Sequence, residues 1–436
     1  MAFPVRYEPP TPSVQDAELL GETIALPFSK RLLKSRIFKA STGERMSSWD
    51  ENDLSKRGIP FDRVANLYEI WGQGGYSLII TGQVVVNPEQ VEFPGIPIIH
   101  KMAENPETLR QFEKMSAAGK ASGSLVVVQL SHPGRRVPSH INTQPVSAGD
   151  VRLEDAEHRG KPIPLTKEGI RLLESQFVYA AEVAYRTKFD GVQINAAYDF
   201  LIAQFLSTKT NNRNDEYGGD ILGRSRIVCE IIQQIRDKVG DPEFIIGVKV
   251  DHEGFRGQMK DAVDFCQALE KLSVDFIELC GGAYRDAEAP EDHITPLEEF
   301  AQEISSSLTK TLVFISGGLR SSEEMAAAIR KKHCASVGVG RPSASDPHLP
   351  RKIISGSLGG PIKPDPKNAS KGLIHEAVGT QMEALARGNK LFDWSNPDEV
   401  LEYKERLQAF QDAREQDLKG GIVRSGCMIW SPGSAV

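Results

Sequence analysis

The sequence predicts an α/β protein built as a closed (β/α)8 barrel, the TIM-barrel architecture. Short, strongly apolar segments alternate with longer amphipathic ones along most of the chain. The short segments are nearly continuous apolar runs, which is typical of strands covered on both faces in a parallel sheet. Eight such strands and eight helices fit into roughly 320 residues, and a barrel of this kind takes roughly 250 residues plus insertions.

Each strand and helix is predicted from its own pattern. The expected strands are 35–41, 76–86, 123–131, 189–195, 243–250, 274–280, 311–318 and 335–341. The expected helices are 59–74, 105–120, 166–186, 224–239, 260–272, 295–308, 320–332 and 347–355. In the fourth helix, Ile227, Ile231 and Ile235 repeat at a spacing of four and form one apolar face. The alternative is a doubly wound open sheet, but the sequence has no Gly-x-Gly-x-x-Gly turn between a strand and a helix.

Three regions are expected along the chain. Residues 1–30 form a proline-rich N-terminal extension, residues 31–360 form the barrel, and residues 361–436 form a linker and a C-terminal helical segment with a helix at 397–418. A long irregular loop, 132–165, follows the third strand. Loops of this length are usually functional or disordered.

Composition and charge exclude several classes of protein. The chain is 40% hydrophobic and 25% charged with a net charge of -7, which is ordinary for a globular protein. It has no tract of Lys and Arg, so no nucleic-acid partner is expected. Its apolar runs are far shorter than the roughly 20 residues that a membrane span needs. With no secretory signal at the start and five scattered cysteines without metal-ligand spacing, we expect a cytoplasmic protein with reduced thiols and no metal. Nothing indicates the oligomeric state.

Glycine-rich turns follow the seventh and eighth strands, in "ISGGLRS" and "VGVGRPSASDP". In a barrel, the carboxyl ends of the strands carry the active site, and these two loops often bind phosphate. Gly317, Gly318 and Gly340 would let backbone N–H groups approach an anion, and the planar fork of Arg341 suits phosphate. The alternative is that these glycines only turn the chain.

Gln129 and Lys249 are polar residues inside apolar strand sequences. A buried polar side chain needs a partner. The two residues either belong to a satisfied core network or line the barrel mouth. At the mouth they would bind the edge of a planar polar ligand, where a lysine stabilises negative charge.

Several stretches together resemble the old yellow enzyme family of FMN-dependent NAD(P)H oxidoreductases. They are "SLIITGQVVV", "VQLSHPGRR", "FDGVQINAAYDFLIAQFLSTKTNNRNDEYGGDILGRSR", "VDFIELCGGAY" and "VGVGRPSASDP". The resemblance runs in order from about residue 25 to about residue 390, and its block from "QFLS" through "DEYGG" is the most specific part.

The resemblance implies FMN lying across the barrel mouth. The residues expected around its phosphate are Gly317, Gly318, Gly340 and Arg341. Those expected around its ring are Gln129, Lys249, Gln83, Ala40, Ser41 and Thr42. In such enzymes NADH or NADPH reduces the flavin, which then transfers a hydride to the β-carbon of an activated C=C bond. The implied substrate is a small hydrophobic carbonyl compound.

The stretch "INAAYDFL" at 194–201 departs from the family pattern. That pattern is His-Ala-Ala-His-Gly-Tyr, or a form with Asn as the second ligand; its first and fourth members bind the substrate carbonyl, and its Tyr donates the proton. Here Asn195 is first, Tyr198 is fourth and Phe200 is sixth. Asn195 and Tyr198 can still donate hydrogen bonds, whereas Phe200 cannot. Gly43 stands where the family usually has Thr or Cys near the flavin O4.

These departures leave several hypotheses open. Tyr198 or water could supply the proton for ordinary reduction. The site could instead catalyse isomerisation, desaturation or cyclisation of a secondary metabolite, or it could bind flavin without redox turnover. An aldolase-type barrel with Lys249 as the Schiff-base amine is a further alternative. A further hypothesis places a phosphate of NAD(P)H on the loop that carries His132, Arg135 and Arg136.

Overall fold

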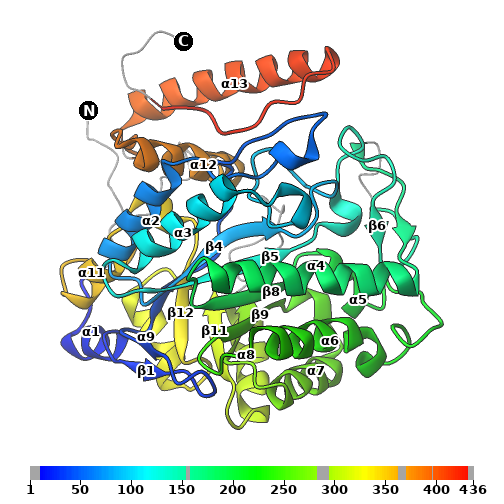
Figure 1. The fold of residues 1–436 in the computed structure, drawn as a ribbon. Helices are drawn as coiled ribbons and strands as arrows, with labels where there is room; N and C mark the ends of the chain where they lie inside the picture. The colour runs from blue at the N-terminus through cyan, green and yellow to red at the C-terminus, as the bar shows by residue number, and fades with distance from the viewer. Residues whose placement is uncertain (1–9, 154–157, 282–293, 362–369, 395, 431–436) are drawn as a thin grey trace.

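Parallel strands close into a barrel in the order β3, β4, β5, β8, β9, β10, β11 and β12, with β12 paired to β3 (Figure 1). The computed structural model describes residues 10–153, 158–281, 294–361, 370–394 and 396–430. The strands are β3 (Ile37–Lys39), β4 (Leu78–Val85), β5 (Leu125–Ser131), β8 (Gly191–Ala196), β9 (Ile245–Asp251), β10 (Phe276–Cys280), β11 (Leu312–Ser316) and β12 (Ser336–Val339). Each of the eight expected strands is present, so the closed barrel is confirmed and the open sheet is wrong.

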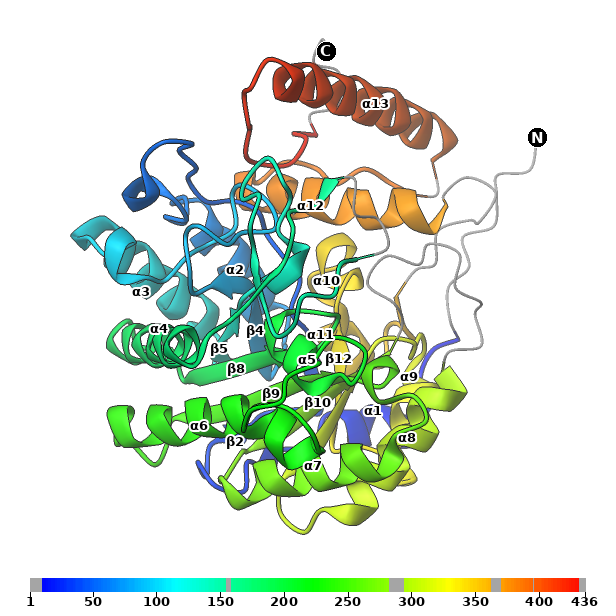
Figure 2. The same cartoon turned by 90° about the vertical axis from the view of Figure 1, so that its right-hand side faces the viewer.

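Helices surround the barrel, and the eight expected ones are confirmed (Figures 1 and 2). They are α2 (Val64–Gln73), α3 (Pro106–Lys120), α4 (Lys167–Arg186), α6 (Ile221–Val239), α7 (Met259–Lys271), α8 (Ile294–Ser307), α9 (Ser322–Arg330) and α11 (Leu349–Ile354). Two more, α5 (Leu201–Leu206) and α10 (Pro342–Ser345), are too short to show a periodic pattern in the sequence. Among the described residues, none of the helices combines the length and apolar character that crossing a membrane requires.

Aromatic rings fill the amino-terminal half of the barrel interior. The rings of Phe276 and Phe314 stack with their centroids 4.6 Å apart, and Phe38 lies 5.2 Å from Phe314. Gly338 makes room for them, because a Cβ atom there would lie 2.4 Å from the Phe38 ring. These rings form a close-packed floor, so the space available to a ligand lies toward the carboxyl ends of the strands.

The N-terminal extension covers the outside of this floor. Leu26 and Leu33, in and beside the hairpin of β1 (Ile24–Ala25) and β2 (Leu32–Leu33), pack into the same cluster as the phenylalanines. The helix α1 (Val14–Leu20) packs against α9 and α11. The first residues of the extension, 1–9, lie outside the described residues, as does most of the expected linker at 361–371.

The C-terminal segment contains two helices, α12 (Lys371–Arg387) and α13 (Pro397–Lys419). The helix α12 packs against α2 and α10, and α13 lies over α12 on the side away from the barrel (Figures 1 and 2). Phe392 stacks on Tyr403 at 4.6 Å and meets Trp430 edge-on at 5.4 Å, which joins α13 to the chain's last described residues. The helix expected at 397–418 is confirmed, whereas α12 was not expected.

The described part of the long loop after β5 is irregular, as expected, apart from the 3-10 helix η3 (Gly134–Arg136) and the short pair β6 (Val146–Ser147) and β7 (Ile163–Pro164).

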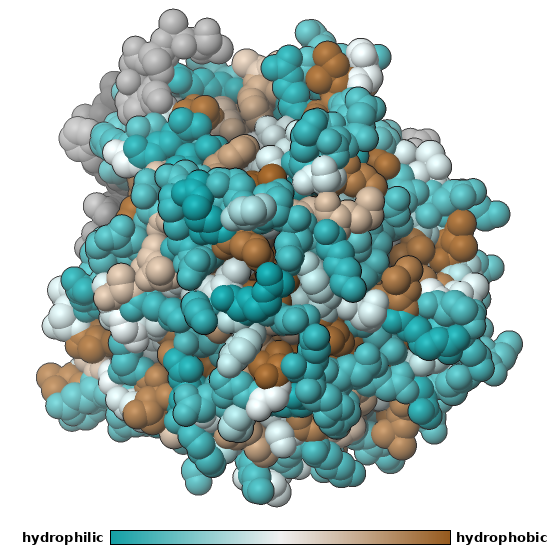
Figure 3. Space-filling view, in the orientation of Figure 1, coloured by the Kyte–Doolittle hydropathy of each residue, from teal (hydrophilic) through white to brown (hydrophobic). Residues whose placement is uncertain are grey.

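On the face of the molecule that Figure 3 shows, hydrophilic residues predominate and apolar ones are scattered. Leu172 on α4 and Leu222 on α6 are 61% and 60% exposed as single side chains. Scattered apolar residues of this kind are normal for a globular surface.

A pair of carboxyl groups lies between α4 and α6. Glu174 is only 4% exposed, and its Oε2 accepts a hydrogen bond from Gln234 Nε2 at 3.1 Å. Burial, together with the neighbouring carboxyl group of Glu230, raises the pKa of Glu174 from 4.5 to about 7. Tyr217 donates its phenolic hydrogen to Glu230 Oε2 at 2.9 Å, so Glu230 already has a donor on one oxygen.

We expect Glu174→Gln to flatten the pH dependence of stability. The pKa of Glu174 is higher in the folded than in the unfolded chain, so unfolding releases a proton between about pH 4.5 and pH 7. The free energy of unfolding therefore falls across that interval, by about 2 kcal/mol from this group. Urea unfolding followed by tryptophan fluorescence at pH 5 and pH 8 should show a smaller loss in the variant. The control is Glu182→Gln, because Glu182 also lies on α4 but pairs with Lys238 in a more exposed position. An equal loss of unfolding free energy in the parent and both variants would contradict the assignment to Glu174.

Candidate active site at the carboxyl end of the barrel

A chain of hydrogen-bonded polar side chains lies above the aromatic floor. Alternate residues of each strand face the interior, and Glu278 and Ser316 stand two positions after Phe276 and Phe314 on their strands. Gln129 Nε2 donates to Gln193 Oε1, and Gln193 Nε2 donates to Glu278 Oε2, both at 2.7 Å. Glu278 Oε1 accepts from Ser316 Oγ at 2.5 Å and lies 2.9 Å from Lys249 Nζ. The structure thus brings Gln129 and Lys249 into one network.

Lys249 carries its positive charge inside this network. Burial opposes the charge, but Glu278, with Cys280 and Asp251, more than offsets it and raises the pKa of Lys249. An amine held as a buried ammonium is a poor nucleophile, so the Schiff-base hypothesis loses its candidate.

A second buried lysine, Lys39, lies in the barrel wall. Burial lowers the pKa of Lys39 to about 8, and its amine donates a hydrogen bond to Ile80 O at 3.2 Å.

The segment after β3 and the middle of β4 border the network. Ser41 Oγ donates to Gln129 Oε1 at 2.9 Å, and Thr42 Oγ1 donates to Ala40 O at 3.1 Å. Gln83 pairs in register with Gln129 on the neighbouring strand. Its side-chain Oε1 is buried and has no hydrogen-bond donor among the described residues. A buried oxygen without a donor indicates a position where a ligand N–H would bind.

The two glycine turns leave open space at the ends of β11 and β12. Gly317 and Gly318 have φ angles of 92° and 87°, which favour glycine. A Cβ atom added at Gly340 or at Gly43 would meet nothing within 4 Å. Arg341 is exposed, and its guanidinium has no partner within the described part of the chain. An anion with several oxygens suits such a turn.

Asn195 is the last but one residue of β8, two positions after Gln193 and on the same face of the sheet. The side chain is 4% exposed; its Nδ2 donates to Ser131 Oγ at 3.2 Å, and its Oδ1 accepts from Ala197 N at 3.3 Å. An amide nitrogen has two hydrogens. One of them therefore has a protein acceptor, and the other remains available for a bound carbonyl oxygen.

Tyr198 follows two residues after the strand. Lys249 Nζ lies 5.6 Å from the centroid of its ring. Burial, then the neighbouring Cys280, Asp251 and Glu278, raise the pKa of Tyr198 well above its usual value. The phenol therefore keeps its proton at neutral pH and can act as a hydrogen-bond or proton donor.

The backbone at Tyr198 and Asp199 is strained. Both residues are left-handed, with φ angles of 56° and 59°. Two consecutive non-glycine residues in this region cost on the order of 1–3 kcal/mol each. In the six-residue family pattern, Asp199 stands at the glycine position. Strain of this kind persists only where the surroundings hold it, and it gathers at functional sites.

Phe200, on the loop after β8, and the three basic residues on the loop after β5 are engaged with other parts of the protein. Phe200 is 2% exposed, and its ring lies 5.1 Å from the guanidinium carbon of Arg136. Burial lowers the pKa of His132 to about 3, so the imidazole is neutral. Arg135 pairs with Asp199 at 2.9 Å, and Arg136 pairs with the fully buried Glu92 at 2.6 Å. Because both arginines are engaged, the structure argues against a nucleotide phosphate at this loop.

Sequence reasoning missed four residues of this site. Gln193 and Glu278 interrupt the apolar strands "GVQIN" and "FIELC", which is the same signal that pointed to Gln129 and Lys249. Asp251 and Asp199 act through backbone contacts and pairing with distant loops. Asp251 ends a strand two positions after Lys249, and Asp199 replaces the glycine of the family pattern, so each had a local signal, but their partners are visible only in the folded chain.

Comparisons with known proteins identify the family of the chain. Residues 26–358 match the family model of the NADH:flavin oxidoreductase / NADH oxidase family. The chain is 36% identical over 401 residues to the NADH-dependent flavin oxidoreductase nadA of Aspergillus parasiticus, covering 88% of this chain and 89% of that protein. It is 29% identical over 362 residues to the NADH-dependent flavin oxidoreductase iliE of Hypocrea jecorina, covering 76% and 88%.

Solved structures share the fold. The old yellow enzyme homologue from Zymomonas mobilis superposes with a TM-score of 0.66 at 23% identity, covering 78% of this chain and 94% of that one. Morphinone reductase in complex with tetrahydroNAD superposes with a TM-score of 0.65 at 21% identity, covering 80% and 93%. The family match, the identity to nadA and the shared barrel together mean that this chain belongs to the NADH:flavin oxidoreductase / NADH oxidase family, that of the old yellow enzymes.

Proposed function

We propose that this flavin-dependent NADH oxidoreductase reduces the C=C bond conjugated to a carbonyl group in a small hydrophobic molecule. FMN bound across the barrel mouth would take a hydride from NADH or NADPH and deliver it to the β-carbon of the alkene. The names of the relatives favour NADH as the donor. The expected cytoplasmic location, where this cofactor is abundant, is part of the same proposal.

The observation that carries the proposal is the polar network beside the unpaired oxygen of Gln83. A flavin ring edge presents N–H donors and carbonyl acceptors in one plane. Gln83 Oε1 lacks a donor, and Gln129 is held in place by its bonds to Ser41 and Gln193. The ammonium of Lys249 would stabilise negative charge at the ring's N–C=O edge. Ala40 and Thr42 belong to the segment that would flank the ring.

The phosphate of FMN would lie on the two glycine turns. Gly317 and Gly318 can expose backbone N–H groups, and the open space at Gly340 admits an anion. The unpartnered Arg341 would supply two hydrogen bonds and a positive charge. These features support the phosphate assignment that the family pattern implies.

Asn195 and Tyr198 would hold the substrate. The free amide hydrogen of Asn195 would bind the carbonyl oxygen and polarise the alkene. The phenol of Tyr198, which stays protonated, would give its proton to the α-carbon as the hydride arrives at the β-carbon. Solvent would then return a proton to the phenolate. This arrangement replaces the tyrosine that the family has two residues later, where this chain has the buried Phe200.

Arg341→Ala should weaken FMN binding. Loss of a charged contact to phosphate costs about 1.5–3 kcal/mol, or about ten-fold or more in the dissociation constant. Quenching of flavin fluorescence on titration of the apoprotein measures it. The control is Arg351→Ala, since Arg351 lies beside Gly74, at the amino-terminal end of the strands. Affinity equal to that of the control would refute the phosphate assignment.

Tyr198→Phe should slow the oxidative half-reaction by about 100-fold, because the proton donor is lost. Stopped-flow absorbance would follow reoxidation of the reduced flavin by 2-cyclohexenone. Reduction of the flavin by NADH should be unchanged, since it needs no proton from the phenol. Tyr185→Phe, on the outer face of α4, is the matched control. A reoxidation rate equal to that of Tyr185→Phe would remove the phenol from the role of acid.

Anaerobic addition of NADH decides between the candidate functions. Bleaching of the flavin followed by reoxidation on adding an enone supports the proposal. The missing hydroxyl at Phe200 favours one second candidate, in which the flavin assists isomerisation, desaturation or cyclisation. Bleaching without reoxidation by any enone would favour that candidate, and absence of bleaching would indicate flavin binding without turnover.

A further inference from the structure

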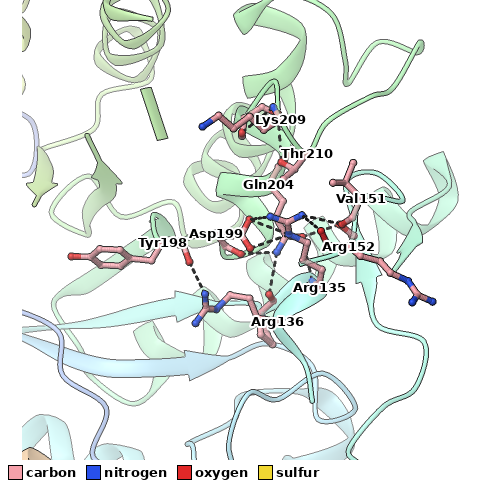
Figure 4. Close-up of polar contacts among 12 residues, drawn as sticks. Arg135, Arg136, Val151, Arg152, Tyr198, Asp199, Gln204, Lys209 and Thr210 are labelled. Atoms are coloured by element: carbon pink, nitrogen blue, oxygen red, sulfur yellow. Dashed lines mark hydrogen bonds and ion pairs between the residues drawn. The ribbon is translucent and has the colours of Figure 1, made fainter. Parts of the chain in front are cut away.

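A set of polar contacts surrounds the strained turn at Tyr198 and Asp199 (Figure 4). The carboxylate of Asp199 accepts hydrogen bonds from Arg135 Nε at 3.0 Å and Arg135 NH2 at 2.9 Å, so the pair is bidentate. The third nitrogen of the same guanidinium, NH1, donates to Val151 O at 2.9 Å. Arg135 thus joins the turn to the long loop that follows β5.

The backbone of the turn is held as firmly as its side chain. Tyr198 N donates to the Asp251 carboxylate at the end of β9, and Tyr198 O accepts from Arg136 NH1 at 3.2 Å. Asp199 O accepts from Gln204 Nε2 at 2.6 Å. These contacts come from three different loops or helices, and they leave the Tyr198 ring pointing away from both arginines (Figure 4).

Aspartate at this position is a feature of this chain. The family pattern has glycine there, which adopts a left-handed backbone without strain. Aspartate tolerates the conformation better than most residues, yet it adds a charge that must be paired. The charge is paired here by a side chain that is only 11% exposed, whereas Asp199 is 26% exposed. Such a pair restricts the turn in a way that glycine cannot.

We propose that Asp199 and Arg135 are positioning residues that lock the left-handed turn and thereby aim the phenol of Tyr198 at the substrate. The inference rests on the proposed function of Tyr198. It explains how a tyrosine two residues earlier than usual reaches the mouth, because the turn reverses the chain between the end of β8 and α5. Neither Asp199 nor Arg135 contacts the substrate in this arrangement.

The test compares Asp199→Asn and Asp199→Gly in the full-length holoenzyme. Asparagine keeps the size and the tolerance for the left-handed region but loses the charge, and glycine removes the strain together with the pair. Hydrogen–deuterium exchange at the Tyr198 amide should be faster by about ten-fold in both variants. Reoxidation of the reduced flavin by 2-cyclohexenone should be slower by about ten-fold, because a displacement of about 1 Å is costly in catalysis. Reduction by NADH and the FMN dissociation constant should be unchanged.

The matched control is Asp215→Asn. Asp215 forms a bidentate pair with Arg213 at 2.9 Å and 2.6 Å, with side-chain exposures of 23% and 9%, and it lies on the loop after α5. It therefore loses an equivalent ion pair outside the turn. This variant should leave exchange at Tyr198 and the reoxidation rate as in the parent.

The Tyr198→Phe background separates positioning from a general structural role. In that background Asp199→Asn should cause no further loss of the reoxidation rate, because it acts through the phenol. A further loss of about ten-fold, or exchange at the Tyr198 amide equal to that of the Asp215→Asn control, would overturn the inference. A different outcome is that exchange at the Tyr198 amide rises in the Asp199 variants while Tyr198→Phe alone reoxidises at the parent rate. The phenol is then not the acid, and the pair of Asp199 and Arg135 has only a structural role, which also overturns the positioning role.

Discussion

The ion pair between Lys249 and Glu278 is the interaction on which the rest of the site depends. Both charges are buried, and an unpaired charge at either place would be very costly. Glu278 also accepts from Gln193 and Ser316, so its position fixes both. Gln193 in turn orients Gln129, whose side-chain oxygen accepts a hydrogen bond from the Ser41 hydroxyl. One carboxylate therefore sets the orientation of polar groups from five strands or strand ends.

This network owes its place to the layers of the barrel. The aromatic rings below it offer no hydrogen-bond partner, so its donors and acceptors find partners within the layer. Among the described residues, the oxygen of Gln83 and one amide hydrogen of Asn195 have no partner there. The contrast between an aromatic floor and a polar upper layer makes the carboxyl end of the barrel suited to a flat molecule with a polar edge. The strained turn at Tyr198 then places a phenol over the same layer.

The fold was largely predictable because the strands are buried on both faces and therefore appear as apolar runs. The helix α12 was missed, although its capping residue Ser370 and the left-handed Gly388 after it are both visible in the sequence. In the site, polar residues within strands were informative: Gln129 and Lys249 were found in this way, and Gln193 and Glu278 could have been. The pair of Asp199 and Arg135 joins residues 64 positions apart, so only the folded chain reveals it.

The position of α12 bears on where the chain can be divided. The stretch that matches the family ends at residue 358, whereas α12 begins at Lys371 and packs on α2 and α10. Met382 and Ala384 on it are wholly buried, and α10 directly follows Arg341. A protein cut where the family match ends would expose the apolar residues of α2 and α10 that α12 covers, next to the turn that carries Arg341. The helix α12 is thus part of the wall of the barrel, and a truncation placed at the end of the family match would remove it.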